Sequence, residues 1–252
     1  MESKETYNKA LKLTANPLRL RLAVVGSLAL TLGGKMLKNF GIIREVARII
    51  EKAAYRVVEA LKAEWIEQEH HFTDRMLGRI EQAIDGYTTK GIVWRAKTFT
   101  DRGRNAQETR YGADFLGIVS IRLPNFSLDK GFLAQAKLLN PPGRMSSSEY
   151  QRLQQQCRNM LNITPDSFVF FYSPTGIRII PASSVISCNT NINLYDYLYS
   201  RTISKFYEDH FACFIGDIRL RAPNIEETLE NIAENYRVRN VLVLYVIHRD
   251  LL

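Results

Sequence analysis

The sequence predicts an α/β protein in which helices flank a mixed β-sheet. Two observations lead to this prediction. A long stretch with helical periodicity comes first, and short segments rich in β-branched and aromatic residues follow it, with another helix among them. The order of a long helix, three strands, a helix and further strands is typical of a sheet with helices on its faces. A chain of 252 residues can hold one domain with a subdomain, or two small domains.

The helical pattern runs from Ile42 to Ile84 and is long enough for two helices. We expect them to meet near Glu67–Phe72, with Thr73 or Asp74 capping the second helix. Asp85-Gly86 should end that helix. Apolar residues recur at steps of three or four and would line one face: Val46, Ile50, Ala53, Val57, Leu61 and Trp65.

Strands are expected next, because three segments combine β-branched and aromatic residues with polar turns between them. These segments are Gly91–Phe99, Asp114–Leu123 and Gly131–Leu139, with Pro124–Lys130 as the turn between the last two. A helix is predicted at Ser148–Leu161, with Ser147 or Ser148 as its cap. The remaining predicted elements are strands at Ser167–Tyr172, Gly176–Ile180 and Val241–His248, and helices at Leu194–Ala212 and Ile225–Tyr236.

The positive charge is concentrated at the N-terminal end. Residues 1–62 contain 12 Lys and Arg against 5 Asp and Glu, whereas the other residues contain 22 against 21. We therefore divide the chain into a basic helical segment, 1–62, and a second unit, 63–252. The basic face either contacts phosphates or is simply solvated, and binding that weakens steeply with salt would favour phosphate contact.

An apolar run at Leu22–Leu32 has 11 residues. It is too short to span a bilayer, which takes about 20. We expect a buried or oligomer-forming helix there, with membrane association as the alternative. The cysteines Cys157, Cys188 and Cys213 are too few and too scattered for a disulfide framework, which favours a reducing cytoplasm.

Three polar residues are placed to meet in the predicted sheet. Gln135 and Lys137 are two apart on one strand and so project from the same face. If the segments starting at Asp114 and Gly131 form a hairpin, Asp114 lies opposite the end of the second strand. Carboxylate and amide oxygens suit Mg²⁺, and a lysine beside them can stabilise the charge of a phosphate. The alternatives are a turn aspartate and the polar face of an edge strand.

These residues resemble the PD-(D/E)xK nuclease superfamily, in particular its Mrr-like branch with a QxK motif, found also in anti-phage effector nucleases. The likeness rests on Asp114 in YGAD and on Gln135-Ala136-Lys137 in FLAQAK, and it extends over about residues 64–185. The upstream segment Glu69–Leu77 resembles the family's first helix, whose glutamate often joins the metal site.

The resemblance implies a restriction-endonuclease-like fold and a Mg²⁺-dependent endonuclease (Mn²⁺ possible) that cuts double-stranded DNA in defence against foreign DNA. Asp114, Gln135, the Ala136 carbonyl and Glu69 would hold the metal, and Lys137 would act on the phosphate. Gln135 replaces a carboxylate, so Glu69 or Glu108 would have to compensate. Arg102 and Arg104 are candidates for phosphate contacts.

Two other functions remain open. The first alternative is an inactive DNA-binding or assembly module, which the loss of a carboxylate at Gln135 suggests. The second is a nuclease that acts on RNA. It carries no helicase motor or nucleotide-binding fingerprint, so a separately encoded sensor or ATPase is a possible partner.

Overall fold

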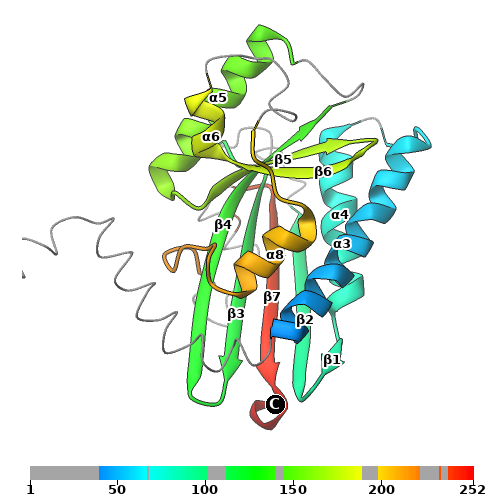
Figure 1. Cartoon of the computed structure of the whole chain (residues 1–252), viewed down its shortest axis with the longest axis vertical. Helices are drawn as coiled ribbons and strands as arrows, with labels where there is room; N and C mark the ends of the chain where they lie inside the picture. The colour runs from blue at the N-terminus through cyan, green and yellow to red at the C-terminus, as the bar shows by residue number, and fades with distance from the viewer. Residues whose placement is uncertain are drawn as a thin grey trace, which may run out of the picture.

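A single mixed sheet of seven strands forms the centre of the protein in the computed structural model (Figure 1). The strand order is β1-β2-β7-β3-β4-β5-β6, and helices pack on the sheet. The prediction of an α/β protein with a mixed, helix-flanked sheet is therefore confirmed. The structure describes residues 40–66, 68–100, 112–139, 145–188, 198–221, 233 and 238–252.

Two of the strand pairs are parallel, β3 with β7 and β4 with β5, and the others are antiparallel. The C-terminal strand β7 lies between β2 and β3, a place that its position at the end of the chain does not predict. The strands are β1 Thr88–Thr89, β2 Ile92–Thr100, β3 Phe115–Leu123, β4 Phe126–Leu138, β5 Ser167–Ser173, β6 Gly176–Pro181 and β7 Asn240–His248.

The helices divide between the two faces of the sheet. On one face pack α3 Phe40–Lys62, α4 Glu69–Ile84 and α8 Ile203–Phe211; on the other pack α5 Ser147–Ile163 and α6 Ala182–Ser187. A short 3-10 helix, η3 Arg249–Leu251, follows β7. Among these described helices none has the length and apolar character needed to cross a membrane.

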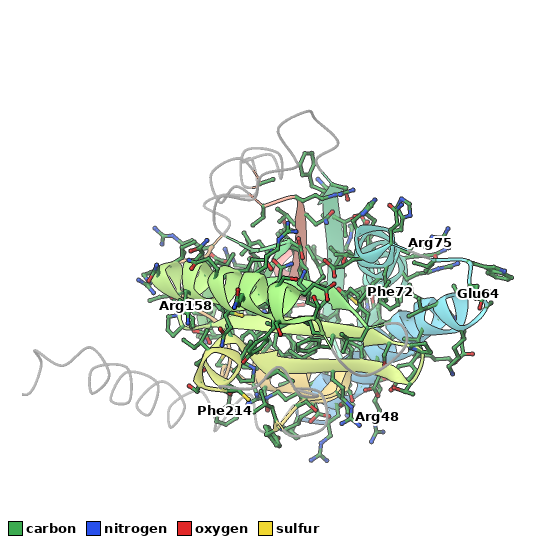
Figure 2. All side chains as sticks on the ribbon, turned by 90° about the horizontal axis from the view of Figure 1, so that it is seen from above. Arg48, Glu64, Phe72, Arg75, Arg158 and Phe214 are labelled. Atoms are coloured by element: carbon green, nitrogen blue, oxygen red, sulfur yellow. The ribbon has the colours of Figure 1, made fainter. Side chains whose placement is uncertain are left out.

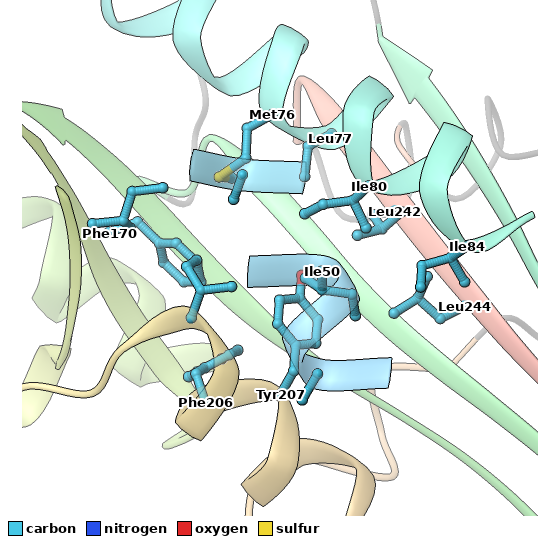
Figure 3. Close-up of a cluster of buried hydrophobic side chains, with 14 of the residues drawn as sticks. Ile50, Met76, Leu77, Ile80, Ile84, Phe170, Phe206, Tyr207, Leu242 and Leu244 are labelled. Carbon is cyan, nitrogen blue, oxygen red and sulfur yellow. The ribbon is translucent and has the colours of Figure 1, made fainter. Parts of the chain in front are cut away.

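The larger apolar core lies beneath α3, α4 and α8 (Figure 3). Helix α3 buries a residue every three or four positions, as its sequence predicts, including Val46 and Ile50. They meet Ile80 of α4, Phe206 of α8 and Leu244 of β7 in one cluster. The prediction of this apolar face was wrong for Trp65, which lies beyond the end of α3 and is 75% exposed. Residues 40–62 belong to the predicted N-terminal segment, yet they pack on the sheet formed by later residues.

The opposite face is covered mainly by α5, which begins with a capping box. The Ser146 hydroxyl accepts a hydrogen bond from the Glu149 backbone N–H, and the Glu149 carboxylate accepts one from the Ser146 N–H. The cap is therefore Ser146 and not Ser147 or Ser148. Leu153 and Met160 of α5 are fully buried against the sheet.

The turn between β3 and β4 is shorter than predicted. Leu123 pairs with Phe126, so Pro124 and Asn125 alone form it, and Asn125 takes a positive φ of 66°. The polar residues Asp129 and Lys130 look like turn residues but lie inside β4. Asp129 is accommodated there because its carboxylate pairs with Arg122 of β3 at 2.8 Å.

Two predicted helix boundaries are wrong, and other predictions fall outside the described residues. Helix α4 begins at Glu69, with Gln68 as its cap residue, and not at the predicted caps Thr73 or Asp74. Thr73 lies inside the helix, where its hydroxyl donates to the Glu69 carbonyl. Helix α8 begins only at Ile203, after the Thr202 cap, whereas Arg201 forms a β-bridge with Ile179. Leu22–Leu32 and most of Ile225–Tyr236 lie outside the described part.

Candidate active site

The hairpin of β3 and β4 brings Asp114 next to Gln135. Phe115 pairs with Ala134, and the Asp114 N–H donates to the Ala134 carbonyl at 2.8 Å. Ala134 and Ala136 pack in the core under α3 and α4, whereas Leu116 and Leu133 pack in the core under α5. Because side chains alternate along a strand, Gln135 projects toward the α5 side, as does Leu133.

A compact hydrogen-bond network joins Asp114 to β4. Its Oδ2 atom accepts the Ala136 backbone N–H at 2.7 Å and also a hydrogen bond from Gln135 Nε2. Gln135 Nε2 donates in addition to the Ala136 carbonyl at 3.0 Å. The other amide atom, Gln135 Oε1, is buried and has no hydrogen-bond donor among the described residues. An unpaired buried oxygen is costly, so this one needs a partner from outside the described part.

Lys137 and Glu69 form the second half of the cluster. Lys137 Nζ lies 3.4 Å from Glu69 Oε1, and Glu69 Oε2 accepts the Leu138 backbone N–H at 2.9 Å. Both side chains are partly buried, at 19% and 32% exposure. Glu69 is the first residue of α4, so the start of this helix is tied to the end of β4. The acidic side chain also suits the positive end of the helix dipole.

The electrostatics of the cluster concentrate on Asp114. Burial, followed by the nearby Glu69 carboxylate, raises the pKa of Asp114 to about 7, against the opposing effects of the Ala136 N–H, Lys137 and Arg239. The Asp114 carboxyl thus gains or loses its proton near neutral pH. A raised pKa of this kind, in a group with a specific charged neighbour, is common at functional sites.

Arg239 was missed in the sequence. It directly precedes β7, and its Nη2 lies 3.3 Å from Asp74 Oδ2 of α4. Its Nε is buried without an acceptor among the described residues, and its charge lowers the pKa of Asp114. Only the placement of β7 beside β3 brings Arg239 to the site. The sole sequence signal was a basic residue before a predicted strand.

The described residues of the site offer the oxygen ligands that a hard divalent cation prefers, but few of these ligands are negatively charged. In the described part of the chain no three His, Cys, Asp or Glu side chains gather into a cluster. The oxygen donors available are the carboxylates of Asp114 and Glu69, the unpaired Gln135 Oε1 and the Ala136 carbonyl. The predicted site residues Glu108, Arg102 and Arg104 lie outside the described residues.

Comparison of the chain with protein-family models, curated proteins and solved structures gave no match. What the site does must therefore be inferred from its chemistry.

Proposed function

We propose that this protein is a Mg²⁺-dependent endonuclease that hydrolyses phosphodiester bonds of double-stranded DNA. The observation that supports this most is the buried Gln135 Oε1, which lacks a donor beside the Asp114 carboxylate. Lys137 follows two residues later on β4 and is held by Glu69. Oxygen ligands for a cation and an ammonium for a phosphate thus belong to one cluster.

Each residue would have a distinct role. Asp114, Gln135, the Ala136 carbonyl and Glu69 would hold the ion, with Gln135 Oε1 as the amide ligand. A bound Mg²⁺ would polarise the phosphate and lower the pKa of a water. Lys137 would orient the attacking water and stabilise the additional negative charge on the phosphate. Glu69 would keep the Lys137 ammonium in position, because its second oxygen is fixed by the Leu138 N–H.

The restriction-endonuclease-like fold is part of this proposal. The succession α4, β2, β3, β4, α5, β5 supports it, with the candidate residues at the start of α4, the start of β3 and the end of β4. A defence role rests on the resemblance alone. A cytoplasmic location rests on the few, scattered cysteines, and a separately encoded sensor or ATPase on the lack of a motor or nucleotide-binding fingerprint in the sequence.

A plasmid-nicking assay tests the proposal. Supercoiled plasmid and a structured RNA are incubated side by side with EDTA, Mg²⁺ or Mn²⁺. We expect nicking of the plasmid only with metal, and none by the Asp114→Ala variant. Cleavage of the RNA alone would replace DNA by RNA as the substrate. Metal-independent cleavage, or cleavage that survives Asp114→Ala, would refute the assignment.

An inactive DNA-binding or assembly module is the second candidate. Among the described residues Asp114 and Glu69 are the two carboxylates of this site, and two anionic ligands are few for a divalent cation. Calorimetric titration of Mg²⁺ into the wild type and into Asp114→Ala separates the two functions. A nuclease should show metal binding that depends on Asp114, whereas an inactive module should show none.

A further inference from the structure

A groove lined by arginines runs between α3 and α4, on residues that the candidate active site does not use. It has a volume of about 330 Å³ and is lined by Arg56, Val57 and Ala60 of α3 and by Arg75, Gly78, Arg79 and Gln82 of α4. All three arginines are exposed, and none of the described residues that line the groove carries a carboxylate. Figure 2 labels Arg75 on α4 and Arg48 on α3.

The arginines of the groove have few partners inside the protein. Within the described part of the chain none of them makes an ion pair, and Arg79 makes one hydrogen bond, to Gln82 Oε1 at 3.1 Å. Several carboxylates of α3 and α4 are bound to other groups. Glu45 accepts from Tyr87, Glu51 from Ser204 and Glu81 from Thr98. The guanidinium groups are therefore available for an external anion.

Basic residues also follow one another at helical spacing on both helices. Arg48, Lys52 and Arg56 follow one another at intervals of four on α3, and Arg75 and Arg79 do the same on α4. Like charges at this spacing are neighbours on the helix surface and destabilise it. All five side chains are exposed. A polyanion seated in the groove would offset the repulsion between its own arginines, Arg75 and Arg79.

Gly78 adds an independent observation. It lies inside α4 and lines the groove, although a glycine there weakens a helix relative to alanine. A Cβ built at Gly78 would meet no atom of the described residues within 4 Å, so no packing among them requires a glycine. The groove therefore has no side chain at this position of α4.

We propose that this groove binds the phosphate backbone of double-stranded DNA. Arginine is suited to this task because its planar guanidinium makes paired hydrogen bonds to a phosphate. Arg75 follows Glu69 by six residues on α4, a rise of about 9 Å along the helix axis. The inference rests on the proposed function for its substrate, but it concerns binding alone.

Binding of a short fluorescein-labelled duplex, measured by anisotropy in EDTA, tests the inference without cleavage. The variants are Arg75→Gln/Arg79→Gln, which removes two charges, and Gly78→Glu, which fills the groove with a negative side chain. Lys90→Gln/Arg249→Gln removes two charges from residues outside the groove and is the matched control. Gly78→Ala is the control for the backbone change. Anionic phospholipid vesicles serve as a second ligand.

Both groove variants should bind the duplex on the order of tenfold more weakly near 0.1 M salt. The double variant should also lower the slope of log K against log salt by about two, since each lost phosphate contact contributes about 0.9. Both controls should bind like the wild type. Unchanged affinity and slope in the groove variants would overturn the inference. So would loss of vesicle binding with duplex binding intact.

The two proposals fail separately. A protein that binds the duplex through the groove but never nicks plasmid would disprove the nuclease and leave the groove assigned. A protein that nicks plasmid but binds the duplex equally well without Arg75 and Arg79 would disprove the groove and leave the nuclease proposal standing.

Discussion

Strand β4 carries two lysines, seven residues apart, whose surroundings differ completely. Lys130, near the start of the strand, is 2% exposed, and its Nζ donates to the His210 carbonyl and, at 2.6 Å, to the Ile215 carbonyl. Lys137, near the end, is partly exposed and pairs with Glu69 at 3.4 Å. The deeper lysine is the better satisfied of the two. Depth of burial alone therefore does not identify a chemical site.

The chain around Lys130 is built to hold it. Gly216 has a φ of +120°, and a Cβ there would approach Lys130 Cδ to 2.8 Å. Only glycine lets the backbone pass so close to the lysine stem at this angle. Burial lowers the pKa of Lys130. The two carbonyls can accept hydrogen bonds from either the ammonium or the neutral amine. We infer a structural role for Lys130.

The aspartates of the two regions differ in the same way. Near Lys130, Asp217 has its carboxylate bound by Arg219 and Thr164. Near Lys137, Asp114 accepts from Gln135, whose other amide atom has no partner among the described residues. The Asp217 carboxylate is thus bonded at both oxygens, whereas the Gln135 amide beside Asp114 is left incomplete. Incomplete polar clusters mark places where a ligand can supply the missing contact.

The largest expected effect is that of Lys137→Ala on catalysis. Loss of a group that stabilises transition-state charge costs on the order of 10²–10³-fold in rate, or more. Stability should change by less than about 1 kcal/mol, because the ion pair with Glu69 is partly exposed. Plasmid nicking and thermal unfolding measure the two quantities. If purified Lys137→Ala cut as fast as the wild type, Lys137 would not be catalytic.

The reverse pattern is expected for Lys130→Met. Methionine can fill the space of the lysine stem but leaves the carbonyls of His210 and Ile215 without this donor. The loss should amount to about 2–4 kcal/mol of unfolding free energy, seen as a fall of roughly 5–15 °C in Tm. Nicking per folded molecule should be unchanged. A stable but inactive Lys130→Met would show that the roles of the two lysines had been exchanged.

The contrast between the lysines also shows what the sequence could and could not predict. Asp114 and Gln135 could be brought together in advance, because a hairpin and the alternation of side chains are local rules. Lys130 was mistaken for a turn residue, because the carbonyls that bury it come from His210 and Ile215, about 80 residues later. Arg239 was missed for the same reason, since only the insertion of β7 beside β3 brings it to the site.

A smaller effect, on the free energy of unfolding, is expected for Asp114→Asn in the metal-free protein. The folded-state pKa of about 7 lies above the unfolded value, so ionisation of Asp114 costs stability progressively as pH rises from about 4 to about 7. Asparagine keeps an oxygen for the Ala136 N–H and does not ionise. In EDTA at pH 8 the variant should be more stable than the wild type by about 1–3 kcal/mol, with the difference vanishing near pH 4.

Urea unfolding at the two pH values provides the measurement. Added Mg²⁺ should stabilise the wild type and leave Asp114→Asn unaffected, because only the carboxylate binds the ion strongly. A wild type that was the more stable protein at pH 8 in EDTA would show that Asp114 is fully satisfied without metal, like Asp217.

Asp217→Asn should show the opposite pH dependence and the smallest effect. Burial by itself would raise the pKa of Asp217, but hydrogen bonds from Arg219 and Thr164 outweigh it and lower the pKa to about 2. The ionised carboxylate therefore contributes stability above about pH 4, and this contribution is lost as pH falls through about 2. At pH 7 we expect Asp217→Asn to lose about 1–2 kcal/mol, reduced by the solvent exposure of Arg219. Urea unfolding should show this loss at pH 7 and a much smaller one near pH 2. An equal loss at both pH values would show that the effect of the substitution does not come from the charge of Asp217.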